Sequence, residues 1–155
     1  MKKLIYACLA VLFFTTLVNA QKVAQKDLQG TWKMISFTAG GLNVDIPTEK
    51  ITLSPEMEAQ MTPEVKQQMQ DGMKQAMEIF KSSFAYVEGN SLRQTMGGQE
   101  QKGSFTMKEQ DGKQYLVLTT EGGTTEDILV TITDKKLHLS QGQGNDAAKF
   151  IYAKQ

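Results

Sequence analysis

Methionines that recur every four residues are the feature of this sequence most suggestive of chemistry. The row comprises Met57, Met61, Met69, Met73 and Met77, with Val65 in the remaining place. Thioether sulfurs bind Cu(I), so a copper site is one interpretation. A row spaced by four drifts around a helix, however, and the chain has only one cysteine and one histidine to assist. We therefore favour packing, because methionine fills irregular gaps in a core, and we expect no metal site.

The residues used for acid–base or nucleophilic catalysis do not form a set. His138 stands alone between Leu137 and Leu139, so it should point outward from a strand whose leucines point inward. No serine lies in a Gly-x-Ser-x-Gly setting. Glu126 and Asp127 are neighbours in an extended segment, so they face opposite sides, and we expect both to be solvated. The sequence therefore predicts no catalytic residues and no enzyme.

The glycine-rich segment 142–147 reads GQGNDA and matches a dinucleotide-binding fingerprint by its letters. It precedes an extended segment instead of opening a helix, so no helix N-terminus is present to hold a phosphate. We reject a nucleotide site on this ground and expect no cofactor.

The first twenty residues have the pattern of a secretory signal. Lys2 and Lys3 precede the apolar run 4–14, and a small residue, Ala20, stands where a signal peptidase would cut. We expect residues 1–20 to be cleaved, which removes Cys8, and residues 21–155 to form a single domain. The protein would then be periplasmic or extracellular.

Charge and hydropathy argue against two classes of partner. Loss of Lys2 and Lys3 reduces the 17 basic residues to 15 against 17 acidic ones, a net charge near −2 with no basic patch. We therefore expect no nucleic-acid partner. No later apolar run is long enough to span a bilayer, so we expect no integral membrane span after the signal is removed.

One segment, Thr62 to Phe84, has helical periodicity. Its apolar stripe comprises Val65, Met69, Met73, Met77, Phe80 and Phe84. Ser54-Pro55 and Thr62-Pro63 are typical helix starts, so we expect a short helix, a break, and a main helix ending near Ser82. Gly72 costs about 1 kcal/mol in a helix relative to alanine, which indicates a close approach to another backbone.

The rest of the chain is typical of short strands joined by tight turns. We expect strands at Asp27–Phe37, Phe84–Glu88, Ser91–Met96, Gly103–Glu109, Gln114–Thr120, Glu126–Thr133, Lys136–Ser140 and Ala147–Lys154. Leu42 to Leu53 has little pattern beyond a short strand at 51–53. In the first strand we expect Trp32, Met34 and Ser36 on one face and Ile35 and Phe37 on the other.

Eight such strands predict a mainly β fold: an eight-stranded antiparallel up-and-down barrel with a helical insert after the first strand. Alternation supplies an inward-facing set, namely Phe105, Met107, Ile128, Val130, Ile132, Leu137, Leu139, Phe150 and Tyr152. The aromatic side chains of Trp32, Tyr86, Phe105, Phe150 and Tyr152 could line a pocket or fill the barrel.

The stretch Gly30-Thr31-Trp32 at the start of the expected mature chain resembles the Gly-x-Trp signature of lipocalin strand A. With the methionine-rich insert and the β-meander, the layout of residues 26–153 resembles the bacterial secreted lipocalin-like domain family. The resemblance implies a calycin-type barrel with Trp32 closing one end. In lipocalins a late arginine commonly packs on that tryptophan, whereas the last strand here offers Lys149 and Lys154.

Taken together, these features favour a secreted lipocalin-like protein that binds a small apolar molecule, with the methionine-rich helix packed on or over the barrel as an adaptable lid. The expected ligand-binding residues are Trp32, Met34, Met73, Met77, Tyr86, Phe105, Met107, Phe150 and Tyr152. The alternative is a rigid filled barrel of the cell envelope that binds another macromolecule through the helix or the loops near Gly97 and Gly122. Neither the ligand nor a protein partner can be named from the sequence.

Overall fold

The computed structural model describes residues 22–142, 144 and 147–155. The expected signal, residues 1–20, and part of the glycine-rich segment 142–147 lie outside these residues. No helix in the described part of the chain is both long and apolar enough to cross a membrane.

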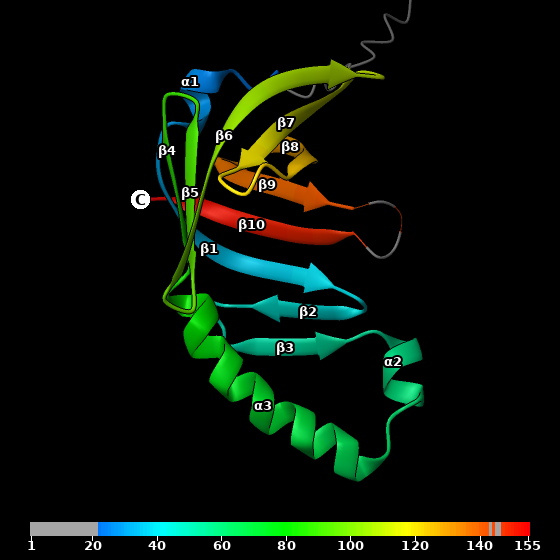
Figure 1. Cartoon of the computed structure of the whole chain (residues 1–155). Coiled ribbons are helices and arrows are strands. Elements are labelled where there is room, and N and C mark those ends of the chain that lie inside the picture. The colour runs from blue at the N-terminus through cyan, green and yellow to red at the C-terminus, as the bar shows by residue number, and fades with distance from the viewer. Residues whose placement is uncertain (1–21, 143, 145–146) are drawn as a thin grey trace, which may run out of the picture.

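Eight strands form the closed antiparallel barrel that the sequence predicts (Figure 1). They are β1 (Gly30–Ala39), β4 (Phe84–Glu88), β5 (Ser91–Met96), β6 (Gln99–Gln110), β7 (Lys113–Thr120), β8 (Thr125–Thr133), β9 (Lys136–Gln141) and β10 (Ala148–Lys154). Each of the strands from β4 to β10 pairs with the next, and β1 pairs with both β4 and β10. Closure leaves these strands without free edges.

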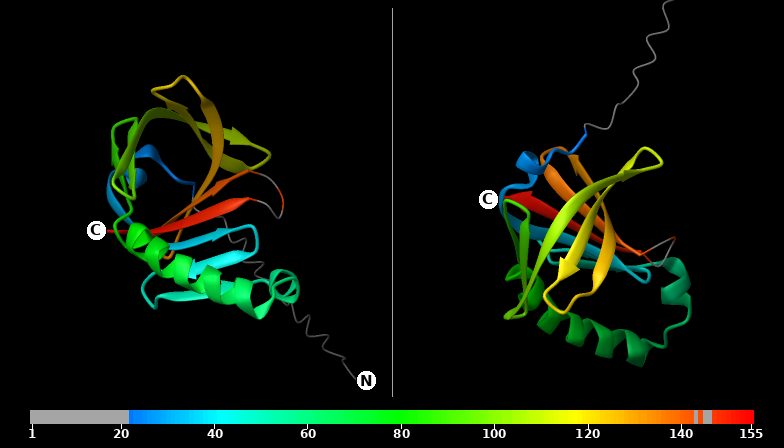
Figure 2. Two further views of the ribbon diagram at one scale, coloured as in Figure 1. Left: turned by 60° about the horizontal axis from the view of Figure 1, so that its bottom comes forward. Right: turned by 45° about the horizontal axis from the view of Figure 1, so that its top comes forward.

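The helical insert lies between β1 and β4, as predicted, and it also contains a hairpin. The insert comprises β2 (Leu42–Asp45), β3 (Lys50–Leu53), α2 (Pro55–Ala59) and α3 (Pro63–Lys81). The side chains of Ser54 and Thr62 cap the two helices by accepting hydrogen bonds from the backbone N–H groups of Met57 and Val65. The hairpin extends the sheet beyond the barrel, and α3 runs diagonally beside this extension (Figures 1 and 2).

Strand β1 changes partner half-way along its length. Its first half pairs with β4, from Gly30 to Lys33, and its second half pairs with β2, from Ser36 to Ala39. Two hydrogen bonds cover the change, from the Met34 N–H to the Ser83 carbonyl (3.1 Å) and from the Ile46 N–H to the Ile35 carbonyl (3.0 Å). The N-terminal half of β1 therefore belongs to the closed barrel wall, whereas on the same edge its C-terminal half pairs with the insert.

A β-bulge in β1 changes which of its side chains share a face, so the faces differ from those predicted. Met34 pairs with Tyr152 on β10, whereas Ser36 pairs with Ile151, so Ile35 is the extra residue. Phe37 consequently shares the inner face with Trp32 and Met34, and the prediction that it lies opposite them is wrong. Its ring stacks on Phe80 of α3 (centroids 5.4 Å apart) and contacts Phe150 of β10 (5.2 Å).

The methionine-rich helix packs on the barrel only through its C-terminal half. Met77 is buried, and Met73 and Phe80 pack against the same core. Val65, near the N-terminus of α3, is 46% exposed. The packing interpretation of the methionines is therefore confirmed for Met73 and Met77, whereas a lid formed by the whole stripe is not what the structure shows.

Two glycines differ in what surrounds them. A Cβ on Gly72 of α3 would meet nothing within 4 Å, so the expected close backbone approach is wrong. A Cβ on Gly103 of β6 would lie 2.6 Å from the Thr119 carbonyl oxygen. Gly103 is therefore the glycine that permits two strands to lie close together.

We expect Gly103→Ala to lower the free energy of unfolding by about 1–3 kcal/mol, because the new methyl group forces β6 and β7 apart. The matched change Gly72→Ala should raise it by about 1 kcal/mol, since alanine is the better helix former and meets no obstacle. Urea denaturation of both variants checks this. A Gly103→Ala protein as stable as the wild type would contradict the β6–β7 packing.

Candidate functional site

The two ends of the barrel differ in how they are closed. At the end where β1 begins, α1 (Gln25–Leu28) covers the opening, and the Trp32 indole N–H donates to the Leu28 carbonyl at 2.6 Å. Val23 and Gln114 exchange two hydrogen bonds that fasten the preceding segment to β7. Trp32 is 2% exposed, so it plugs this end, as the resemblance implies.

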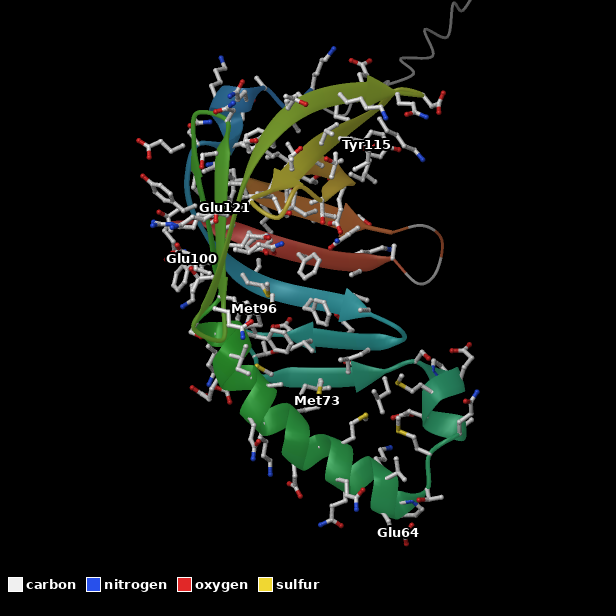
Figure 3. The ribbon with its side chains drawn as sticks, in the orientation of Figure 1. Glu64, Met73, Met96, Glu100, Tyr115 and Glu121 are labelled. Carbon is white, nitrogen blue, oxygen red and sulfur yellow. The ribbon has the colours of Figure 1, made fainter. Side chains whose placement is uncertain are left out.

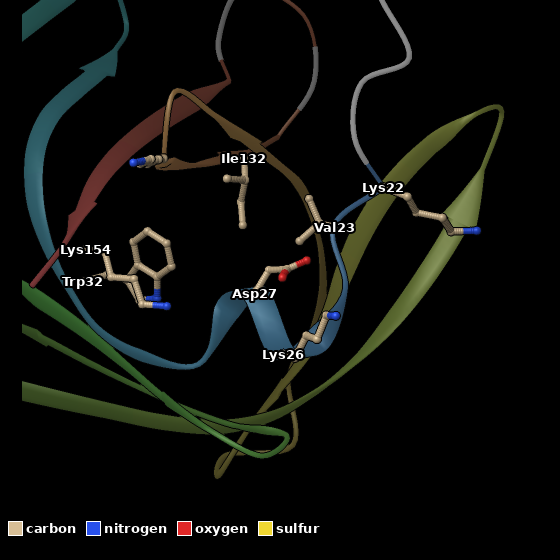
Figure 4. Close-up of a pocket in the computed structure, with 8 residues that line it drawn as sticks. Lys22, Val23, Lys26, Asp27, Trp32, Ile132 and Lys154 are labelled. Atoms are coloured by element: carbon tan, nitrogen blue, oxygen red, sulfur yellow. The ribbon is translucent and has the colours of Figure 1, made fainter.

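A shallow pocket of about 370 Å³ lies outside this plug (Figure 4). Its apolar floor is formed by Val23, Trp32 and Ile132, and the other lining residues are Lys22, Lys26, Asp27, Lys135 and Lys154. The Lys154 ammonium lies 5.3 Å from the centroid of the Trp32 ring, so of the two lysines in the last strand it is Lys154 that packs on Trp32. Lys22 pairs with Glu109, and the Asp27 carboxylate accepts from the Ala24 N–H. We interpret this surface as part of the closure.

The opposite end, which we call the mouth, contains a larger hollow. Its outer compartment, about 650 Å³, is lined by Met34, Ile79, Phe84, Gln94, Thr95, Met96, Gly97, Gln99, Glu100, Gln101 and Tyr152. Its inner compartment, about 190 Å³, is lined by Gln94, Met96, Gln101, Leu118, Glu126, Ile128, Leu139, Gln141 and Phe150. The two compartments share Gln94, Met96 and Gln101, and together we call them the mouth pocket.

The insert supports one side of the mouth pocket. Ile79, near the C-terminal end of α3, would lie 3.2 Å from a Cβ on Gly97, at the tip of the β5–β6 hairpin. Figure 3 shows Met96 at this tip, close to the end of the helix, and Met73 farther along α3 facing β3. The hairpin that forms the rim thus rests on the helix end, while Met73 lines a separate groove between α3 and β3.

The hydrogen bonds inside the mouth pocket come from glutamines. Gln94 donates through its side-chain nitrogen to the Tyr152 hydroxyl at 3.3 Å, and Gln141 donates to the Glu126 carboxylate. Burial raises the pKa of Tyr152 to about 12, against the smaller opposing effect of the Gln94 hydrogen bond. Tyr152 therefore forms a neutral polar floor beneath the pocket.

Glu126 and Asp127 face opposite sides of β8, as predicted. Asp127 lies on the outer face, where Lys108 binds it at 2.8 Å. Glu126 is partly buried and lines the mouth pocket, so the prediction that both carboxylates are solvated is wrong for Glu126. His138, between the buried Leu137 and Leu139, is half-buried on the outer side of β9.

Three of the nine predicted ligand-binding residues, Met34, Phe150 and Tyr152, line the mouth pocket. The others lie elsewhere. Trp32 plugs the closed end, Phe105, Met107 and Met77 belong to the packed core, and Met73 faces β3. Tyr86 is 37% exposed, with Arg93 over its ring at 5.0 Å, so it lies on the outer wall and does not line the interior.

The polar residues Gln94, Gln101, Glu126 and Gln141 line the mouth pocket but were not predicted as site residues. The signal that could have found them is the continued alternation of the inward series. Gln94 follows Leu92 by two residues, Gln141 follows Leu139, and Glu126 precedes Ile128. The inward series of β8 and β9 thus turn polar at the strand end nearest the mouth, whereas in β5 the polar Gln94 is followed by Met96.

No protein-family model matches the chain, and no curated protein matches it. Among solved structures, the chain is similar to the crystal structure of a DUF4847 family protein from Bacteroides vulgatus, with a TM-score of 0.48 and 13% identity over 82% of this chain and 93% of that chain. The class of this protein therefore follows from its own strands: a closed, eight-stranded antiparallel barrel with a helical insert.

The raised pKa of Tyr152 makes the stability of the fold depend on pH in the alkaline range. The unfolded chain loses the phenolic proton near pH 10, whereas the folded chain holds it to about pH 12. The stabilisation is therefore fully present below pH 10 and is lost as the pH rises from 10 to 12, by about 3 kcal/mol in total.

Denaturation of the wild type and Tyr152→Phe at several pH values between 8 and 12 measures this effect. The variant should show a shallower decline, and Tyr86→Phe, altered on the outer wall, should decline as the wild type does. Identical slopes in the wild type and Tyr152→Phe would contradict a buried, neutral Tyr152.

Proposed function

We propose that this protein is a secreted, lipocalin-like binding protein that holds a small, mainly apolar molecule in the mouth pocket. The observation that carries the proposal is the outer compartment, whose volume of about 650 Å³ falls within the range of small-molecule sites. Secretion is supported by the pattern of residues 1–20. We assign the protein no catalytic step.

The composition of the mouth pocket supports this choice. Apolar side chains from several elements meet there, including Met34 of β1, Ile79 of α3, Met96 of β5 and Phe150 of β10. Polar side chains lie among them, including Gln94, Gln101, Glu126 and Gln141, and such groups fix the orientation of a bound molecule. Met34 and Met96 are flexible and polarisable, so they can adjust to the shape of a guest.

A second candidate function is a rigid barrel that binds another macromolecule of the cell envelope. The observation favouring it is the dense packing of the closed half, where Phe105, Val130 and Leu137 are each at most 2% exposed. The N-terminal half of α3, where Val65 is 46% exposed, would then be a contact surface.

Binding of the neutral fluorescent probe N-phenyl-1-naphthylamine distinguishes the two functions. We expect saturable binding of one probe per protein, because the mouth pocket removes its rings from water. Gln101→Trp, which places an indole in the pocket, should weaken binding at least tenfold. Ser104→Trp, on the outer face of the same strand, is the matched control and should bind normally. A folded wild-type protein that binds no probe would contradict the proposed function and favour the macromolecular alternative.

A further inference from the structure

The mouth pocket is asymmetric in charge. Glu126 is the one ionisable side chain among the residues that line its inner compartment. The outer compartment adds Glu100 and Tyr152, and no lysine or arginine lines either compartment. Glu100 is bound by Lys102 at 2.8 Å and faces Arg93 at 3.7 Å, and the Lys102 hydrogen bond lowers the pKa of Glu100. Glu126 therefore carries the uncompensated charge of the pocket.

Glu126 has one partner within the pocket, the side-chain amide of Gln141. No ion pair to Glu126 occurs within the described ranges, whereas its neighbour Asp127 is paired with Lys108 on the outer face. A carboxylate only accepts hydrogen bonds, and its two oxygens have capacity for more than one donor. Placing an apolar body over this carboxylate without a compensating donor would be costly.

The glutamines of the pocket also present acceptors. Gln94 uses its amide nitrogen on the Tyr152 hydroxyl, and Gln141 uses its own on Glu126. Their carbonyl oxygens remain to accept hydrogen bonds from a guest. The Glu126 carboxylate and these two amide oxygens thus require donors from a ligand, whereas Thr95, Gln99 and Gln101 can donate as well as accept.

We infer that the molecule bound in the mouth pocket is an amphipathic cation, with an amine-type head group beside Glu126 and an apolar body among Met34, Met96 and Phe150. This inference rests on the proposed function and names its ligand class. An ammonium group supplies both the opposite charge and several donors, and such charge-assisted hydrogen bonds are stronger than neutral ones. A fatty acid would instead bring a second carboxylate next to Glu126, and like charges repel.

Three ligands of equal chain length test the inference: octylamine, octanol and octanoate, each measured by displacement of the naphthylamine probe at neutral pH. We expect octylamine to bind the wild type at least tenfold more tightly than octanoate, with octanol between them. Glu126→Gln should reduce the amine-to-carboxylate ratio to near one. Asp127→Asn removes the same charge from the adjacent residue on the outer face, and this control should keep the ratio.

The outcomes separate the inference from the function on which it rests. If the probe binds and octanoate displaces it as well as octylamine does, the inference is overturned while a binding function stands. If the probe and all three ligands fail to bind the folded wild type, both are overturned. The wild-type comparison of octylamine with octanoate needs no variant, so it decides the inference even where Glu126→Gln does not fold.

Discussion

Every other part of this structure depends on the way strand β1 distributes its hydrogen bonds. Along one side β1 pairs with β10 for nearly its whole length, and along the other it pairs first with β4 and then with β2. The hydrogen bonds of Met34 and Ile46 leave no gap at the change of partner. A strand has only two edges, and one edge of β1 is occupied by β10. On the other edge, β2 can therefore pair with β1 only where β4 does not. The division of β1 thus makes one end of the barrel a closed ring and gives the other a rim built partly from the insert.

The bulge at Ile35 connects this division to the packing. Because it turns Phe37 inward, an aromatic series runs from Phe150 on β10 through Phe37 to Phe80 on α3. Aromatic pairs of this kind stabilise beyond the area they bury. The series holds the end of α3 at the rim, where Ile79 supports the β5–β6 hairpin. The helix therefore shapes the mouth pocket without covering the barrel.

Much of this fold follows from local sequence chemistry, and the parts that do not follow have physical reasons. Proline after a hydroxyl residue specified the starts of α2 and α3, and glycine turns specified the hairpins. Strand β2 could not be predicted, because its pairing with β1 depends on a partner change that no local pattern records. The bulge inverted the predicted side of Phe37 for the same reason, since an extra residue in one strand is defined only by its neighbour.

The candidate site was less predictable than the fold. Aromatic and methionine side chains were expected to mark it, yet only three of the nine line the mouth pocket, and others, such as Phe105 and Met77, belong to the packed core. The site is marked instead where the inward series becomes polar, at residues such as Gln94 and Glu126. A search for apolar alternation passes over such residues, because a polar side chain in a strand is ordinarily on the solvent side.

The central claim is that the change of partner along β1 leaves a binding site at the mouth, and the methionines allow this claim to be tested most directly. They lie at the mouth (Met34, Met96), in the core (Met77, Met107) and along the insert (Met57, Met61, Met69, Met73). NMR spectra of protein labelled with carbon-13 at the methionine methyl groups can follow a titration with N-phenyl-1-naphthylamine. The structure predicts that the Met34 and Met96 signals shift most and that those of Met57 and Met61 stay in place. Shifts concentrated at Met57 and Met61, with Met34 and Met96 unchanged, would contradict it.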